Sequence, residues 1–292
     1  MKRMKGLAVL CASAVTVSAL GGCGKQAEMT AGITLTMLGV IVLIPMASLV
    51  IYTAQMDFHD FIHTITRERV LASFKVSFET AFAASVINTV MGLILAWVLV
   101  KYEFPGKKVM DGMIELPFAL PTAVAGISLT ALTTDQGWIG RIFTRWGIHI
   151  AYTKFGITIA LIFIGIPFVV RAVQPVLEKM DSSCEEAAQV LGAGRAEIFR
   201  KVIFPEIRPA LLTGFGLAFG RCLGEYGSVV FIAGNKPYET EIAPLMIMSE
   251  LQEYDYASAT AIALVMLAAS FLVLFAMNLI QSKSGRIVRG GR

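Results

Sequence analysis

The stretch EAAQVLG, residues 186–192, is followed after a polar interval by VIFP, residues 202–205. Both belong to a polar, helix-forming island between two long apolar segments. Asp181, Ser182 or Ser183 can cap a first helix there, and Gly192 then allows a tight turn before a second helix resumes. The sequence therefore predicts two short helices joined by an elbow of small residues, with Pro205 opening the apolar segment that follows.

The rest of the chain is mostly apolar. Of its 292 residues, 56% are hydrophobic and 16% are charged, and the mean hydropathy is +0.70, which is more apolar than a soluble domain. Several apolar runs can each cross, as a helix, a hydrocarbon core of roughly 30 Å. They do not alternate as barrel strands would. We expect an all-α polytopic membrane protein with about six transmembrane helices, at residues 31–53, 74–100, 109–132, 155–177, 207–232 and 257–281.

The basic residues orient these helices. With the start of the first span inside, 17 of the 25 Lys and Arg residues are cytoplasmic, seven are outside, and Arg221 lies within a span. This asymmetry follows the positive-inside rule and places the polar island in the cytoplasm. The net charge of +4 thus reports topology and predicts no nucleic-acid binding. The cytoplasmic set is Lys2, Arg3, Lys5, Lys25, Lys101, Lys107, Lys108, Arg171, Lys179, Arg195, Arg200, Lys201, Arg208, Lys283, Arg286, Arg289 and Arg292.

The N-terminal residues do not fit this topology. A basic start, a short apolar run over Leu7–Leu20 and the sequence LGGC at residues 20–23 are typical of a lipoprotein signal. Cleavage and lipidation at Cys23 would export the new N-terminus and move every later loop to the opposite side, against the charge pattern. Either the segment lies at the inner surface without spanning, or it is a fusion or start-site artefact and the working protein begins near Met29. The second interpretation is preferred.

Three regions are expected on this basis. Residues 1–28 form the atypical signal-like or artefactual segment. Residues 29–282 form the transmembrane domain. Residues 283–292 form a basic cytoplasmic tail.

The fifth predicted span contains GRCLGEYGS, residues 220–228. Arg221 and Glu225 are four residues apart, on one face of a continuous helix. Either charge alone is costly in a bilayer, but as a pair they offset each other. Two interpretations stay open: Arg221, Glu225, Tyr226 and Ser228 line or gate a translocation path, or the ion pair holds the bundle together. Both place the segment in the interior.

The third predicted span contains LPFALPTAVAG, residues 116–126. Pro117 and Pro121 each remove a helical hydrogen bond and bend or break the helix. Backbone freed at membrane depth must be satisfied by protein or line a cavity, and free N–H groups near Thr122 can hold an oxyanion. A simple kink is the alternative. Three acidic residues near span ends are expected to be interfacial: Glu79, Asp111 and Glu115.

The sequence contains no catalytic constellation and no expected metal site. It has no Walker A sequence, nucleophile elbow or HExxH motif, so the chain is not expected to hydrolyse ATP or to bind a cofactor itself. His59 and His63 are four residues apart but are interpreted as part of an outer-surface amphipathic turn. The four cysteines form no CxxC pair and predict no disulfide framework: Cys11, Cys23, Cys184 and Cys222.

Taken together, these motifs resemble a known transporter family. The spacing of Glu186, Ala187, Ala188, Gly192 and Pro205 is similar to the EAA loop of ABC importer membrane subunits. The string GEYGSVVFIAGN at residues 224–235 resembles the T subunit of the bacterial sulfate/thiosulfate ABC permease, and the resemblance covers roughly residues 33–281. Further similar segments are LPFALPTAVAG at 116–126, FVVRAVQPVL at 168–177 and ETEIAPL at 239–245. The chain departs from the usual pattern at Phe204, Cys222 and its N-terminus.

The resemblance implies a multi-pass permease subunit in a bacterial inner membrane, whose EAA loop docks into an ATP-binding subunit. It implies a second permease of the W type, two ATP-binding subunits and an extracytoplasmic sulfate-binding protein as partners. Ala187, Ala188, Val190 and Leu191 can fill an apolar groove on the ATP-binding subunit, with Glu186 at its rim. The alternatives are a molybdate or tungstate ABC permease and, from a different class, an ion-coupled secondary anion transporter or a channel.

Overall fold

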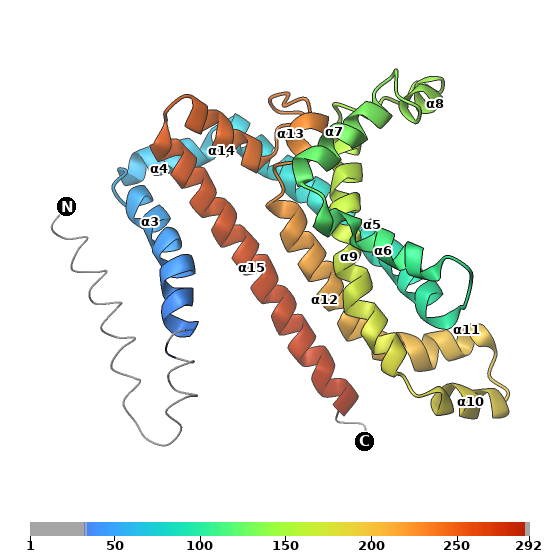
Figure 1. Cartoon of the computed structure of the whole chain (residues 1–292). Coiled ribbons are helices and arrows are strands. Elements are labelled where there is room, and N and C mark those ends of the chain that lie inside the picture. Colours follow the sequence, from blue (N-terminus) through green and yellow to red (C-terminus); the bar gives the residue numbers. More distant parts are fainter. Residues whose placement is uncertain (1–31, 33, 290–292) are drawn as a thin grey trace. The chain divides into compact units, whose positions relative to one another are not determined.

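The computed structural model describes residues 32 and 34–289 (Figure 1). The expectations for residues 1–28 therefore lie outside the described residues. The chain divides into two compact units, one up to Phe61 and one from Ile62 onward. The described part contains helices and no strand, which confirms the all-α class.

The first unit contains an apolar helix over Thr34–Thr53. Its middle is a π-helical turn, η1 (Gly39–Leu43), and its second half is α3 (Ile44–Thr53). Large apolar side chains along it are exposed, for example Ile41 and Leu43 at 64% each. A helix with apolar side chains exposed on all sides suits a hydrocarbon environment.

The second unit is built around three long helices. α5 (Glu68–Lys101), α9 (Lys154–Lys179) and α12 (Phe204–Leu223) pack against one another. The other elements are α4 (Phe58–Thr66), which begins in the first unit, α6 (Lys107–Ala119), α7 (Thr122–Thr133), α8 (Gly140–Thr144), α10 (Ser182–Val190), α11 (Arg195–Ile198), η2 (Phe199–Ile203), α13 (Val229–Ile232), α14 (Ala243–Gln252) and α15 (Tyr256–Arg289).

The described helices account for the predicted spans. Five are long and apolar enough to cross a membrane, and α6 with α7 forms a bent pair that makes up to six. Five of the six predicted ranges are matched closely. The range 207–232 was wrong at its C-terminal end, because α12 stops at Leu223 and Gly224 caps it. At the other end, α11, η2 and α12 form one apolar helix over Arg195–Leu223.

Apolar side chains form one cluster at each end of the three-helix core. The first joins α5, α9 and α12 to α13, α14 and α15, with Leu161, Phe219 and Leu245 among its buried members. The second joins the same three helices to α6 and α11, with Leu99 and Ile198 among its members. The core thus connects the two ends of the second unit.

Short helices lie beyond both ends of α9 (Figure 1). α8 projects beyond the end where α9 begins, in a loop that exposes Trp138 and Trp146. α10 and α11 lie beyond the end where α9 stops. In the topology set by the basic residues, the α8 loop is outside and α10 is cytoplasmic.

Candidate coupling loop and translocation path

α10 begins at a capped end. Asp181 is its N-cap, and Oδ1 of Asp181 accepts a hydrogen bond from the Ser183 amide at 3.0 Å. This bond lowers the pKa of the Asp181 carboxyl, because it stabilises the charged form. Of the three residues that the sequence proposed as caps, Asp181 therefore takes the role.

The elbow after α10 depends on one glycine. Gly192 has φ +85°, in the left-handed region that favours glycine. Its amide donates to the Gln189 carbonyl at 2.9 Å, and the Ala193 amide donates to the Ala188 carbonyl at 3.0 Å. Gly194 then caps α11. The prediction of two short helices with a small-residue elbow is confirmed.

The loop that contains α10 and its elbow exposes apolar side chains next to a charged one. Val190 and Leu191 are 88% and 87% exposed, although both are large hydrophobic residues. Glu186 and Ala187 are exposed as well. Ala188, in contrast, is partly buried and packs against the second apolar cluster, which contains Leu99 and Ile198. An exposed apolar tip of this kind is a candidate surface for another protein.

Pro205 does not interrupt the helix that leaves the loop. It is the second residue of α12, and α12 continues directly from α11 through the π-helical turn η2. The loop is therefore joined to α12 by continuous helix.

A second connection joins α10 to α5, and the sequence did not predict it. Lys101 Nζ lies 2.6 Å from Oε1 of Glu185. Nearby, the rings of Trp97 and Phe199 pack edge to face at 5.5 Å. The sequence had counted Lys101 only as one of many cytoplasmic basic residues.

The break after α12 contains a buried carboxylate. Glu225 lies beyond the end of the helix, so the expectation that it shares a helix face with Arg221 was wrong. The ion pair nevertheless forms, with Arg221 Nη1 at 2.6 Å from Glu225 Oε2. The other carboxylate oxygen accepts from the Ser228 amide at 2.9 Å and from its hydroxyl at 3.0 Å. Both oxygens of a side chain that is 2% exposed are thereby satisfied.

The break between α6 and α7 bends the chain by 111°. It falls at Leu120 and Pro121, which have extended backbone angles, and Thr122 starts α7 with no side-chain cap. Pro117 remains inside α6. The bend expected from two prolines therefore occurs at the second of them.

The two breaks lie against each other. α7 packs on α13. A Cβ atom on Gly126 would lie 2.7 Å from the Ser228 Cα, and a side chain on Gly227 would overlap the Thr122 hydroxyl. Tyr226 packs against the first apolar cluster, which contains Leu161 and Phe219. The structure thus brings Thr122, Glu225 and Ser228 together, and their role in translocation stays a prediction.

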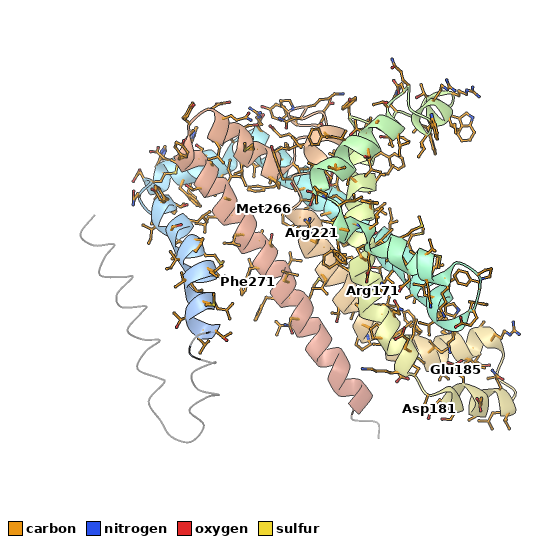
Figure 2. All side chains as sticks on the ribbon, in the orientation of Figure 1. Arg171, Asp181, Glu185, Arg221, Met266 and Phe271 are labelled. Carbon is orange, nitrogen blue, oxygen red and sulfur yellow. The ribbon has the colours of Figure 1, made fainter. Side chains whose placement is uncertain are left out.

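A charged cluster joins α6 to α9. The sequence placed Asp111 and Glu115 near a span end but did not pair them with Arg171. Arg171 Nη1 lies 2.9 Å from Asp111 Oδ1, and Nη2 lies 2.7 Å from Glu115 Oε1. Figure 2 labels Arg171 on α9, between Arg221 and Glu185 in the view. The signal was present in the sequence, because an arginine within an apolar run requires a partner. Asp111 also borders an open pocket of about 650 Å³ at the cytoplasmic ends of α5 and α9.

The chain matches one family model over more than half of its length. Residues 88–286 match the binding-protein-dependent transport system inner membrane component. The chain therefore belongs to this family of inner-membrane transport components. It is a multi-pass membrane protein and a permease subunit of an ABC importer rather than an enzyme.

Individual relatives make the likeness more specific. The chain is 48% identical to the sulfate transport system permease protein CysT of Salmonella typhimurium, over 90% of this chain and 95% of the relative. The CysT protein of Escherichia coli gives the same identity and coverage. That of Synechocystis is 45% identical, over 85% of this chain and 87% of the relative.

Solved structures share the fold. A bacterial ABC transporter involved in the import of the acidic polysaccharide alginate superposes with a TM-score of 0.74 at 16% identity, over 89% of this chain and 96% of that chain. A second alginate transporter structure, in complex with an alginate-bound periplasmic protein, also gives 0.74 at 18% identity, over 88% and 94%. At such identities the likeness concerns the fold.

Proposed function

We propose that this chain is the T-type permease subunit of an ATP-driven importer of sulfate and thiosulfate. The observation that carries the proposal is the 48% identity, along 90% of the chain, with permeases named for sulfate transport. The two adjacent helix breaks, between α6 and α7 and after α12, provide a place where an oxyanion can bind.

Arg221 is the residue proposed to meet the anion. One of its nitrogens binds Glu225, and the side chain is 35% exposed, so other guanidinium donors remain for a ligand. Because Glu225 offsets the charge, the attraction is weak enough for the anion to leave again, as a transport path requires. The uncapped first turn of α7, at Thr122, offers amide groups of the kind that hold oxyanions.

The loop of α10 and α11 is proposed to dock into an ATP-binding subunit. Val190 and Leu191 provide the apolar tip, and Glu186 provides a charge at its rim. ATP is bound and hydrolysed by that partner, and this chain binds no cofactor. The complete importer is proposed to contain a second permease of the W type, two ATP-binding subunits and an extracytoplasmic sulfate-binding protein.

Transport then follows alternating access. Closure of the ATP-binding subunits moves α10, and the continuous helix from Arg195 to Leu223 carries that motion to the break at Gly224. The path opens outward to receive the anion and is reset inward after hydrolysis. Arg221 lies two residues before the end of this helix, so its position follows the helix directly.

The experiment measures labelled sulfate uptake in cells that lack their own sulfate permease and express this chain with its partner subunits. We expect uptake that thiosulfate inhibits and that Arg221→Gln reduces strongly, with Arg221→Lys retaining part of it at equal membrane abundance. Transport of molybdate in place of sulfate would refute the proposed substrate. Uptake that persists without the ATP-binding subunit and follows an ion gradient would place the chain among secondary transporters.

A further inference from the structure

The last residue of α5 makes a contact that docking alone does not explain. Lys101 Nζ lies 2.6 Å from Glu185 Oε1 and 5.6 Å from the centre of the Trp97 ring. The Lys101 and Glu185 side chains are 28% and 18% exposed, so the pair is shielded more than an ordinary surface pair. The adjacent Glu186 is exposed and makes no ion pair within the described residues. Figure 2 shows Glu185 on α10.

The first turns of α5 are held just as specifically, at the outer side. Arg69 donates from Nε and Nη2 to the two carboxylate oxygens of Glu241, at 2.8 and 2.7 Å. The Glu241 side chain is fully buried, and such a two-pronged arginine contact fixes direction as well as distance. Arg67 Nη2 lies 3.1 Å from Glu250 of α14, whose side chain is 5% exposed.

A hydrogen bond adds to this outer attachment. The hydroxyl of Ser77 accepts from the amide of Ala243, the first residue of α14, at 2.7 Å. Arg67 at the N-cap of α5, with Arg69 and Ser77 on its first three turns, therefore holds the segment Glu241–Gln252.

The helix between these two attachments is uninterrupted. α5 has 34 residues, no internal proline and no break, and at 1.5 Å per residue it is about 50 Å long. It packs along α9 and α12. A continuous helix that is ion-paired near both ends provides a mechanical connection from one end to the other.

We propose that α5 is a strut that couples α10 to the outer segment Glu241–Gln252, with Lys101 and Glu185 as its positioning residues at the inner end. This rests on the proposed function, in which an ATP-binding subunit moves α10. The outer mouth then responds to nucleotide through α5 as well as through α12. Glu185 and Glu186 have different roles. Glu185 pairs with Lys101 within the chain, and Glu186 faces the ATP-binding subunit.

The test uses the assembled importer in proteoliposomes, with Met248→Cys on α14 as a reporter in a chain whose native cysteines are replaced by serine. Met248 is 38% exposed. The rate at which a maleimide reacts with the introduced thiol is measured without nucleotide and with ATP plus vanadate. We expect nucleotide to change this rate several-fold. Lys101→Glu or Glu185→Lys should abolish the change, and the two substitutions together should restore it.

Three further variants check the mechanism. Lys101→Arg keeps the charge and should keep the response. Lys108→Glu alters charge at the same inner end, where Lys108 makes no ion pair within the described residues, and should leave the response intact. Arg69→Lys removes the two-pronged contact at the other end and should weaken the response in a protein of normal abundance.

The outcomes test the α5 strut and the proposed sulfate substrate independently. A full nucleotide response in both single variants, a failure of the double variant to restore it, or no response in the parent chain overturns the strut. Sulfate uptake is recorded on the same vesicles. A chain that shows the response and its rescue but carries no sulfate supports the strut and refutes the proposed substrate.

Discussion

At the residue scale, Asp181 determines where α10 begins. Asp181→Ala removes the acceptor for the Ser183 amide, so we expect faster hydrogen–deuterium exchange over residues 182–190, with Asp181→Asn restoring much of the protection. The same bond lowers the carboxyl pKa. The stabilisation of α10 by the charged Asp181 cap is therefore fully present above the unfolded pKa of about 3.9. It is lost as the pH falls through the lower pKa of the folded state. Equal exchange in the alanine variant and the parent would show that the cap is dispensable.

Gly126 marks the closest approach of the two helix breaks. A Cβ there would lie 2.7 Å from the Ser228 Cα and 2.9 Å from its carbonyl carbon, which are backbone atoms that cannot rotate away. Gly126→Ala should cost roughly 1–3 kcal/mol, as overpacking does in other cores. The measurement is the thermal midpoint of the purified protein. Gly112→Ala in α6 is the matched control, because nothing lies within 4 Å of its Cβ position and alanine favours a helix.

At the element scale, the elbow and the charged rim of α10 carry the docking prediction. Gly192→Asp strains a residue at φ +85°, and Glu186→Lys reverses an exposed charge. Each should lower uptake by roughly tenfold or more, since a wrong charge at an interface costs several kcal/mol and about 1.4 kcal/mol is tenfold. Gly194→Ala is the control, because Gly194 has φ −74° and open space around it. Normal uptake in both altered proteins, at normal membrane abundance, would rule against docking.

The sequence predicted the elements better than their ends. Apolar runs of sufficient length identify spans, and the elbow followed from one glycine and a polar capping residue. The end of α12 was missed because the apolar run continues past it, and hydropathy does not register that Glu225 lies beyond the helix and is satisfied there by Ser228 as well as by Arg221. The break at Pro121, in contrast, followed from a residue that lacks an amide hydrogen.

Contacts between distant residues were the part of the site that sequence could not supply. Lys101 and Glu185 are 84 positions apart, and Arg69 and Glu241 are 172 apart. Each of these residues is, in the sequence, one charge among many at the edge of a span. Only the packing of α5 against α9 and α12 decides which opposite charges meet.

At the scale of the whole molecule, the exposed tip of the loop predicts a stable complex. Co-expression with the candidate ATP-binding subunit should allow both to be purified together from membranes. Cys184, exposed on α10 beside Glu185, provides a native probe of the contact. Its reaction with a maleimide should be several-fold slower in the complex than in the chain alone. An unchanged rate in a complex that transports sulfate would place the ATP-binding subunit elsewhere on the chain.

The orientation of the chain decides whether any of these contacts can occur, because ATP is available on one side of the membrane only. Reversal would place 17 of the 25 Lys and Arg residues outside, against the positive-inside rule. Two sites on opposite ends of α9 report it: Cys184 after that helix, and Trp146→Cys in the loop before it, where the native side chain is 74% exposed.

In cells that express the chain without its ATP-binding partner, a membrane-impermeant maleimide should reach the thiol introduced at position 146 in intact cells. It should reach Cys184 only after the membrane is opened. A variant with Cys184→Ser and no introduced thiol sets the background. Labelling of Cys184 from outside would put α10 on the side without ATP, and the docking loop, the strut and the direction of import would all have to be rejected together.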